Sequence, residues 1–448
     1  MNKFYSTLLY LSIILGLFSS CNDDNDCPGV DPQAPIINIT SGNLSMNIGD
    51  SIILKANSIS LLPTTYSWSM DSVEVSTDSI FIFKKDYSGD FEVQLTATNE
   101  KGSTVTKTQI HVNPGRYKEG TFILSEGSYS TPGKLSFIST DGNVTVDAYE
   151  QENGGKLGTY SQDLFIHNHK MYIVSQNGGN DGGYLTILNA ETLKKERAFQ
   201  EELSENVSRP SHVAVLDDDN IYLRDNNGIK RFQPSTGEIT LIEGSQKARK
   251  NTMAVCKGKL FATVGKTVVI IEKGQDAITN TIEFEGEVSG VIKASDGNLW
   301  VSDANGYIYK IDTETYAEIG KQYVGDEAKS VLDASFSSTP SITAKGDTLY
   351  MNGTGTQIYR HVFSTAETTL MVDAKEIIEE EEVQGTYNTV AVNPRTGVVI
   401  MNANTSPWGS GTYYTCFFDF STPEAPLSQK IVNLPQYPAG TFFTYSFE

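Results

Sequence analysis

Hydrophobic and polar residues alternate with a period of two along much of the chain from residue 34 onward. In "FEVQLTATN", Phe91, Val93, Leu95 and Ala97 fall on one side of an extended chain and the polar residues between them on the other. This alternation is typical of a strand that buries one face. Six short segments between residues 34 and 114 show it, so we predict an antiparallel β-sandwich there, with Trp68 in its core.

One strand pattern recurs seven times between residues 116 and 448. Its copies begin at Phe122, Tyr172, Tyr222, Phe261, Trp300, Tyr350 and Ile400, at intervals of 50, 50, 39, 39, 50 and 50 residues. Short strands repeated every 40 to 50 residues or so are typical of a β-propeller. Another strand pattern precedes each copy except the first, and two more follow it. We therefore predict seven blades of four strands each.

The first and last pieces of the repeat complement each other. The copy at Phe122 has no strand pattern before it, whereas "AGTFFTYSF" from Ala439 matches the preceding strands and stands last in the sequence. If this segment completes the first blade, the ring closes and no strand edge is left free at the seam. The predicted fold class is all-β, with an N-terminal sandwich (residues 34–114) followed by a seven-bladed β-propeller (residues 116–448) closed by the C-terminal strand.

The N-terminal residues form a separate segment. Residues 1–20 carry one charge, Lys3, before an apolar stretch that is short for a membrane-spanning helix. The segment resembles a bacterial lipoprotein signal peptide, which implies lipidation of Cys21; an ordinary signal peptide with an incidental cysteine is the alternative. Residues 21–33 form an expected flexible tether. Its acids resemble the surface-export tag of Bacteroidota lipoproteins, or they only solvate the tether. The expected location is the outer membrane, lipid-anchored and exposed at the cell surface.

Charge and cysteine content narrow the possible partners. The formal net charge is −21, and such a surface repels the phosphate backbone, so no nucleic-acid partner is expected. The four cysteines do not form a disulfide framework. Cys27 lies on the tether, while Cys256 and Cys416 lie within apolar strand patterns, where we predict small buried side chains.

The predicted ring places a polar mouth at one face. The first strand of each blade begins there and the second strand ends there, and the loops after the second strand are long in blades one, two and seven, which are neighbours in a closed ring. Aromatic rings beside amide side chains suit a large, flat, polar-rimmed small molecule. The candidate ligand-binding residues are Tyr129, Gln162, Gln176, Asn177, Arg209, His212, Tyr387, Asn388, Asn404 and Trp408. Some of them, Trp408, Tyr129, Arg209 and His212 among them, can instead simply cover a blade or cap the tunnel.

No catalytic or metal-binding motif is apparent. The sequence has no His-Glu-x-x-His, no Gly-x-Ser-x-Gly and no phosphate-cradling loop. His167 and His169 fall in a turn on the face opposite the mouth, so we expect no metal there. The acids Glu379 to Glu382 are expected to form a solvated loop rather than a calcium site. We predict no cofactor, no metal and no catalytic residue, although carboxylate pairs for hydrolysis leave no sequence signature.

Two segments resemble known families. "DYSGDFEVQLTATNEKGSTVTKTQIHV" resembles the second half of a PKD or related immunoglobulin-like domain, although the usual Trp-Asp-x-Gly-Asp-Gly element is absent after Trp68. Together with the signal and the acidic tag, repeats such as "GNLWVSDANGYIYKIDTET" resemble a family of Bacteroidota surface propellers of unknown function, similar in pattern to YncE-like propellers.

The propeller resemblance implies a function. The best understood members of that group capture cobalamin at the cell surface and pass it to a TonB-dependent outer-membrane transporter. It therefore implies capture of a small nutrient, with a corrinoid as the leading candidate and such a transporter as a partner. No ligand contact can be transferred residue by residue. The alternatives are a glycan- or protein-binding adhesion module and, third, a lyase or hydrolase.

Overall fold

The computed structural model describes residues 32–333, 337–379, 382–406, 411–432, 434 and 436–444. These residues form two compact units: the first reaches Lys85 and resumes at Gly89–Asn113, and the second contains Asp86–Ser88 and the chain from Pro114 on. The predicted signal peptide, Cys21 and most of the predicted tether lie outside the described residues. None of the helices in the described part has the length and apolar character that a membrane crossing requires.

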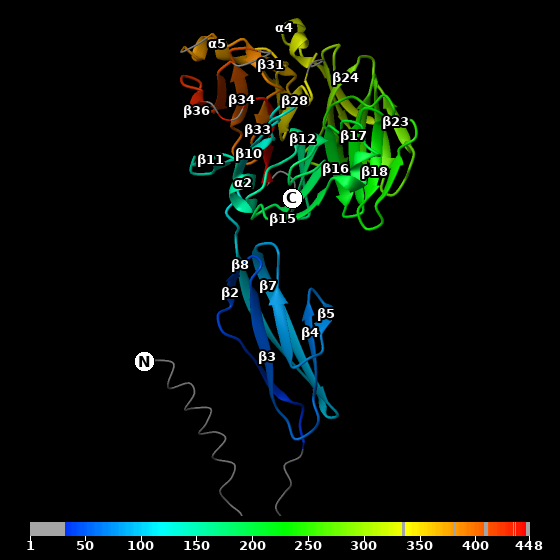
Figure 1. Ribbon diagram of the computed structural model, residues 1–448, viewed down its shortest axis with the longest axis vertical. Helices are drawn as coiled ribbons and strands as arrows, with labels where there is room; N and C mark the ends of the chain where they lie inside the picture. The colour runs from blue at the N-terminus through cyan, green and yellow to red at the C-terminus, as the bar shows by residue number, and fades with distance from the viewer. Residues whose placement is uncertain are drawn as a thin grey trace, which may run out of the picture. The chain divides into compact units, whose positions relative to one another are not determined.

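The first unit consists of two sheets (Figure 1). In the order in which the strands pair, one sheet contains β1 (Ile36–Thr40), β3 (Ser51–Ile59) and β6 (Ile80–Lys84), and the other contains β2 (Ser45–Asn47), β8 (Gly102–Asn113), β7 (Gly89–Asn99), β4 (Thr65–Met70) and β5 (Val73–Ser76). Side chains from both sheets form one hydrophobic cluster. Every sheet neighbour in this unit is antiparallel except β2 and β8.

The predicted alternation produces the core of the first unit. Val93, Leu95 and Ala97 on β7 are fully buried, while the polar residues between them are not. Trp68 is also fully buried, and its Nε1 donates to the carbonyl of Asp78 at 2.8 Å. The prediction of a core tryptophan is thus confirmed, and the indole N–H has the partner that its burial requires.

The second unit is all-β and propeller-like, with seven sheets among its described residues. The strands, sheet by sheet, are β37 (Pro438–Phe443), β9 (Gly120–Ser125), β10 (Lys134–Ser139), β11 (Val144–Thr145); β12 (Thr159–His167), β13 (Lys170–Gly178), β14 (Leu185–Asn189), β15 (Lys195–Phe199); β16 (His212–Asp217), β17 (Asn220–Asp225), β18 (Gly228–Gln233), β19 (Glu238–Leu241); β20 (Ala254–Cys256), β21 (Lys259–Val264), β22 (Thr267–Glu272), β23 (Asn280–Glu283); β24 (Val288–Lys293), β25 (Leu299–Asp303), β26 (Tyr307–Ile311), β27 (Glu318–Tyr323); β28 (Ile342–Lys345), β29 (Thr348–Met351), β30 (Gln357–Val362), β31 (Glu367–Asp373); and β32 (Gly385–Thr386), β33 (Ala391–Val392), β34 (Val399–Asn404), β35 (Tyr413–Phe418), β36 (Leu427–Val432).

Helices are few and short in the described part of the chain. They are α2 (Ala148–Asn153), α3 (Glu201–Ser204), α4 (Asp326–Lys329), α5 (Ala374–Ile377) and a 3-10 turn, η1 (Ser330–Leu332). Each precedes the first strand of the next sheet in the sequence, so the helices belong to the connections between sheets rather than to the sheets themselves.

Each recurring strand of the predicted repeat forms the second strand of a sheet. The copies lie in β9, β13, β17, β21, β25, β29 and β34. In β9 and β34 every residue is buried, because neighbouring sheets cover both faces of the strand. Cys256 on β20 and Cys416 on β35 are buried, as predicted.

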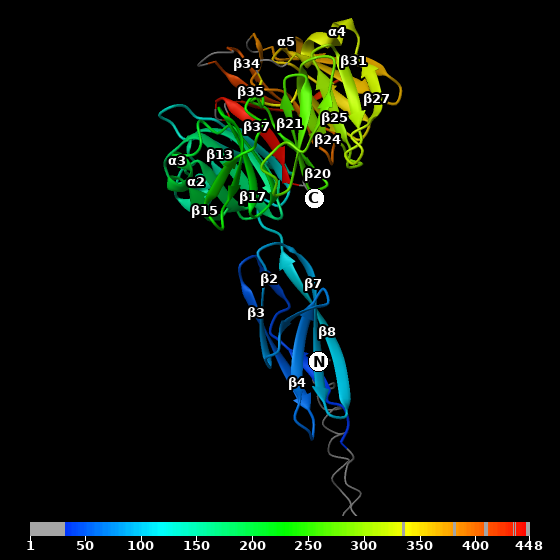
Figure 2. The same ribbon diagram turned by 90° about the vertical axis from the view of Figure 1, so that its right-hand side faces the viewer.

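The C-terminal strand pairs with the first strand of the repeat, as predicted. β37 is antiparallel to β9, with Phe442 opposite Phe122 and Pro438 opposite Ser125, and Figure 2 shows β37, in red, within the second unit. The first and last sheets also share a hydrophobic cluster that includes Ile123 and Ile400. The chain therefore covers the edge of β9 with residues that lie more than 300 positions away in sequence.

Candidate functional site

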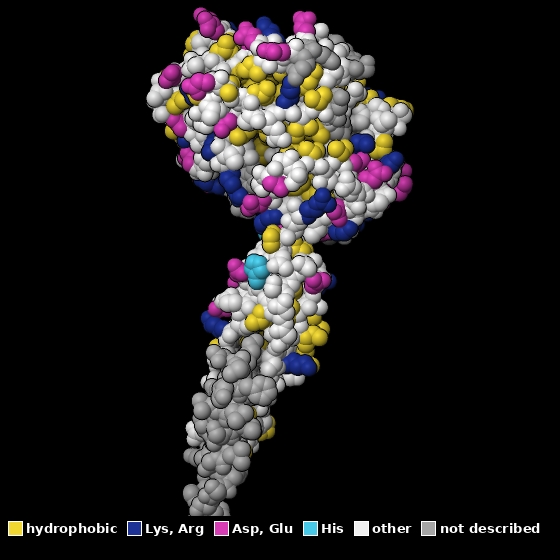
Figure 3. Space-filling view, turned by 90° about the vertical axis from the view of Figure 1, so that its left-hand side faces the viewer, with side chains coloured by type: hydrophobic (Ala, Val, Ile, Leu, Met, Phe, Trp, Pro, Cys, Tyr) yellow, Lys and Arg dark blue, Asp and Glu magenta, His cyan; other side chains and the backbone are white. Residues whose placement is uncertain are grey.

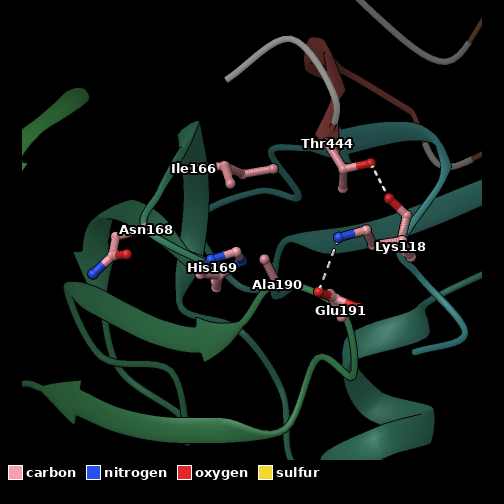
Figure 4. A pocket seen from close by; sticks show the side chains of 7 residues that line it. All are labelled: Lys118, Ile166, Asn168, His169, Ala190, Glu191 and Thr444. Atoms are coloured by element: carbon pink, nitrogen blue, oxygen red, sulfur yellow. Dashed lines mark hydrogen bonds and ion pairs between the residues drawn. The ribbon is translucent and has the colours of Figure 1, made fainter. Parts of the chain in front are cut away.

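Two cavities lie near the turns that join first to second strands. The smaller, of about 190 Å³, is lined by Lys118, Ile166, Asn168, His169, Ala190, Glu191 and Thr444 (Figure 4). Lys118 and Glu191 form an ion pair of 3.2 Å across it. Glu191 also accepts from the N–H groups of Ser88 and Gly115 at 3.2 and 3.3 Å. Its carboxylate is therefore occupied in holding the chain in place.

The charge of Glu191 fits this structural role. Burial acts to raise the pKa of its carboxyl group, but the hydrogen bonds from Ser88 and Gly115 and the charge of Lys118 outweigh burial and lower the pKa. The neighbouring His169 ring stacks on Tyr87, with ring centroids 3.9 Å apart. These groups bind one another, so this cavity offers little to a ligand.

The larger cavity, of about 390 Å³, is lined by His167, Asn168, Asp217, Asp218, Asp219 and Asn220. Two of its carboxylates already have cationic partners, because Asp217 pairs with Lys273 and Asp218 with Lys170. No group of three or more His, Cys, Asp or Glu side chains within the described ranges could hold a metal ion.

Charged and polar side chains gather at the opposite end of the inner strands. We call this end the mouth, and define it by Glu126, Gln162, His212, Arg224, Lys250 and Tyr387. Glu126 follows the end of β9, Gln162 and His212 lie near the starts of β12 and β16, Arg224 lies near the end of β17, and Lys250 and Tyr387 precede β20 and β33. Antiparallel pairing brings strand starts and strand ends together, so five of the seven sheets contribute to the mouth.

Glu126 is the buried carboxylate of the mouth. Only 8% of its surface is exposed. Burial raises the pKa of its carboxyl group, while the charge of Lys250 and the nearby side chains of Tyr387 and Gln162 act to lower the pKa. Its backbone N–H donates to Tyr437 and its carbonyl accepts from Ser161, which fixes the residue between the sheets of β37 and β12.

Lys250 and Arg224 give the mouth positive charge. Lys250 is exposed to solvent, yet surrounding protein lowers the pKa of its ammonium group, an effect that the charge of Glu126 opposes. Arg224 is partly buried and donates from Nε and Nη2 to the carbonyl of Ala248, each at 3.1 Å, and from Nη1 to Ser211 at 3.3 Å. All of these acceptors are neutral.

Two amide oxygens in this region are buried without a hydrogen-bond partner. They are Oε1 of Gln162 and Oδ1 of Asn251, whose residues are 3% and 2% exposed. Leaving a buried acceptor unpaired costs roughly 1 to 3 kcal/mol. Such groups are uncommon in folded proteins, and a bound water, ion or ligand is one usual explanation.

Residues 337–340, which precede β28, cross the space that the inner strands enclose. His212 Nε2 lies 2.8 Å from the Ser338 carbonyl, and Asn251 Nδ2 donates to Thr339 at 3.2 Å. Asn388 accepts from the Ser338 N–H at 3.0 Å and donates to Ala439 at 2.9 Å. The segment thus ties together the third, fourth, sixth and seventh sheets.

The buried side chain of His212 holds residues 337–340 in place through the carbonyl of Ser338. Burial lowers the pKa of its imidazole to about 3, so the ring is neutral at physiological pH. Because Nε2 faces a carbonyl and must donate, Nδ1 accepts from the hydroxyl of Ser211, 3.0 Å away. Neither nitrogen remains available to a ligand.

Tyr387 joins the mouth to an aromatic cluster. Its ring contacts Tyr413 and Tyr437 edge to face, with centroids 6.5 and 5.6 Å apart. Burial, followed by the nearby Glu126, raises the pKa of the Tyr387 hydroxyl well above its usual value. The hydroxyl is therefore protonated at physiological pH.

The structure places the other predicted residues less centrally. Gln176 and Asn177 are half-buried at the end of β13, and Arg209 and Tyr129 are exposed, the latter by 80%. Asn404 is buried and, in the amide orientation that satisfies both atoms, accepts from the Tyr387 N–H and donates to Ser406 at 3.1 Å each. Trp408 lies outside the described residues. Of the predicted residues, the structure thus brings together Gln162, Tyr387, His212 and Asn388. The side chains of His212 and Asn388 hold residues 337–340 in place.

The charges of the mouth were missed. We predicted a polar mouth from the sequence but did not select Glu126, Arg224 and Lys250, which lie at or just outside the strand ends. Lys250 directly precedes Asn251 in "QKARKN", and Glu126 follows "FILS" in "FILSEG". Extending each strand pattern by one or two residues toward the mouth would have found these two.

Comparison with known proteins identifies the propeller-like region. The family described as a domain of unknown function, DUF5074, matches residues 119–444. A quinoprotein alcohol dehydrogenase-like protein from Bacteroides thetaiotaomicron VPI-5482 is similar in structure, with a TM-score of 0.54 and 16% identity over 89% of this chain and 96% of that chain. The Pan2 WD40 domain of Neurospora crassa has a TM-score of 0.41 and 10% identity over 62% and 80%. At these identities the first likeness shows the fold alone. No curated protein matches the chain.

Proposed function

The chain belongs to the DUF5074 family, and from this premise we propose that it is a non-enzymatic binding protein that captures a small ligand at the mouth. In this proposal the second unit is a seven-bladed β-propeller closed by β37, and the first unit is a PKD- or immunoglobulin-like sandwich that acts as a spacer. The protein is lipidated at Cys21, faces outward from the outer membrane and passes its ligand to a TonB-dependent transporter. A corrinoid is the leading candidate ligand.

The convergence of polar side chains from five sheets carries this proposal. Rigid strands hold these side chains, and the hydrogen bonds of His212 and Asn388 to residues 337–340 fix the inner strands. A preorganised site pays less ordering entropy on binding than a mobile one. The unpaired oxygens of Gln162 and Asn251 are ready to accept from a ligand's N–H or O–H groups.

Calorimetric titration tests the proposal. The chain from residue 32 onward, which keeps both units whole, is titrated with cobalamin and with a panel of glycans. We expect heat with cobalamin, and weaker binding by a Gln162→Leu variant than by the wild type. The matched control is Gln233→Leu, because Gln233 ends β18 on the face away from the mouth. Absence of binding to every corrinoid would remove the leading ligand, and equal effects of both variants would remove the site.

One observation favours a second function, adhesion to a protein partner. Hydrophobic side chains reach the surface of the first unit (Figure 3). On the outward side of β1, β3 and β6, Ile36 pairs with Ile59 and Ile53 with Ile82, and all four are at least half exposed. Apolar side chains gathered on a surface often mark a protein contact. Loss of partner binding by an Ile53→Lys, Ile82→Lys variant, with ligand binding at the mouth unchanged, would support adhesion.

A further inference from the structure

Positive charge at the mouth contrasts with the acidity of the whole chain. Against a formal net charge of −21, the mouth places the Arg224 guanidinium on the carbonyl of Ala248, two residues before Lys250, and the charge of Arg224 contributes to the lowered pKa of Lys250. Two cations that repel each other cost stability unless something offsets the repulsion. Of the carboxylates around them, Glu126 is the one that opposes the effect on Lys250.

The available carboxylates do not neutralise the two cations. Neither Lys250 nor Arg224 forms an ion pair within the described ranges. Two acidic residues, Asp225 and Glu126, lie near them. Asp225 follows Arg224, but it pairs with Lys230 at 3.3 Å and accepts from the N–H of Ser208 at 2.8 Å. Glu126 is buried, and burial raises the pKa of its carboxyl group, which favours the neutral acid. Positive charge therefore remains at the mouth.

We propose that the mouth recognises its ligand through an anionic group, a phosphate or a carboxylate, held by Lys250 beside Arg224. The unpaired oxygens of Gln162 and Asn251 then accept from N–H or O–H groups elsewhere on the same ligand. The inference rests on the proposed function and specifies its ligand class: a small molecule with an anionic group and hydrogen-bond donors. Lys250 supplies an exposed ammonium group, and Arg224 is held in position by Ala248 and Ser211.

A bound anion offsets the effect of the surroundings on Lys250, where desolvation and the charge of Arg224 lower the pKa of the ammonium group. Desolvation of an ammonium group is unfavourable without a counter-charge. A bound anion supplies that counter-charge and forms charge-assisted hydrogen bonds, which are about twice as strong as neutral ones.

Thermal unfolding in the presence of simple anions tests the inference. The chain from residue 32 onward is heated in rising concentrations of inorganic phosphate or of acetate, with sodium chloride keeping the ionic strength constant. We expect a saturable rise in Tm, because a ligand that binds only the folded state stabilises it. Lys250→Met should weaken the apparent anion affinity about tenfold, and Lys250→Arg should restore most of it.

A charge-matched variant removes general salt effects. Lys293→Met removes the same charge at the last residue of β24, at the opposite end of an inner strand, and should leave the anion dependence unchanged. Saturation with phosphate alone identifies a phosphate-bearing ligand, and saturation with acetate as well extends the class to carboxylates. No saturable rise with either anion, or equal loss in Lys250→Met and Lys293→Met, overturns the inference.

Failure of this inference can be told apart from failure of the proposed function. The same preparations are titrated with cobalamin and the glycan panel in the presence and absence of phosphate. Binding that is indifferent to phosphate and to Lys250→Met, but lost in Gln162→Leu, overturns anion recognition and leaves ligand capture at the mouth intact. Absence of binding to every probe overturns both.

Discussion

The buried carboxyl group of Asp163 makes stability depend on pH in a way that can be calculated. Asp163 follows Gln162 on β12, is 3% exposed, and accepts from the backbone N–H of Val213 at 3.1 Å. Burial raises the pKa of its carboxyl group from 3.8 to about 7, which the backbone hydrogen bonds from Val213 and Leu164 oppose. The folded state therefore prefers the protonated acid.

The sign and size of the effect follow from proton linkage. Between pH 4 and pH 7 the folded protein holds a proton on Asp163 that the unfolded chain has lost, so the free energy of unfolding falls as pH rises. The slope is about 1.4 kcal/mol for each pH unit. The contribution is fully present below pH 4 or so and gone above pH 7 or so, a total loss of roughly 4 kcal/mol.

Replacing the acid by its neutral analogue isolates this term. In Asp163→Asn the titration is absent, so the wild type should lose roughly 4 kcal/mol relative to the variant between pH 4 and pH 7. Urea unfolding at several pH values measures this difference, and any fixed cost of the amide group cancels because it is the same at every pH. Stability curves for the two proteins that run parallel across this range would refute the reasoning.

A second carboxyl group serves as a control of opposite sign. Burial acts to raise the pKa of Asp217, but hydrogen bonds from Asn220 and Asp219 outweigh it and lower the pKa. Its contribution is present above the unfolded pKa and is lost as pH falls. Asp217→Asn should therefore lose stability relative to the wild type at neutral pH, and the difference should shrink toward pH 3.

Three further predictions concern packing and reactivity. Phe443→Ala removes a side chain that packs between the first and last sheets, and it should lower the free energy of unfolding, measured in urea, by about 3 to 5 kcal/mol. Val432→Ala, at an exposed position, is the control and should lower it by under about 0.5 kcal/mol. Similar losses in the two variants would argue against closure by β37. His212→Ala should cost about 1 to 3 kcal/mol by freeing the Ser338 carbonyl, equally at pH 5.5 and pH 8 because the imidazole is neutral at both, and a clear difference between these pH values would contradict the assignment. Burial raises the pKa of the Cys256 thiol to about 11, so a thiol reagent at pH 8 should label it only after denaturation; rapid labelling of the native protein would show that the packing is looser.

The strand pattern was predictable because it is local and repeated. Apolar residues at fixed spacing, such as Tyr172, Tyr222 and Trp300, identified the second strand of each sheet without knowledge of its neighbours. The pairing of β37 with β9 was also predictable. The strand at Phe122 had no first strand before it, and the segment from Ala439 matched a first strand that had no second strand after it. Both inferences depend on counting strands, which tolerates an error of a few residues.

The chemistry of the mouth was harder to predict because it depends on distant residues. His212 Nε2 lies 2.8 Å from the carbonyl of Ser338, which is 126 positions away in the sequence. The charge of Lys250 acts to lower the pKa of Glu126, although the two residues belong to different sheets. Sequence periodicity does not show which side chains from different sheets contact one another, nor which loop lies between those sheets. Tyr129 was chosen as an aromatic residue in a long loop after a second strand, and in the structure its side chain is exposed.

Binding of a corrinoid by the mouth is the central claim, and one titration tests it most directly. Cobalamin is titrated in a calorimeter into the wild type and into a double variant, Gln162→Leu with Lys250→Met, which changes both an unpaired oxygen and a charge of the mouth. The account predicts saturable heat for the wild type and at least a tenfold weaker affinity for the variant. Identical isotherms for the two proteins, or no heat from either, would contradict it.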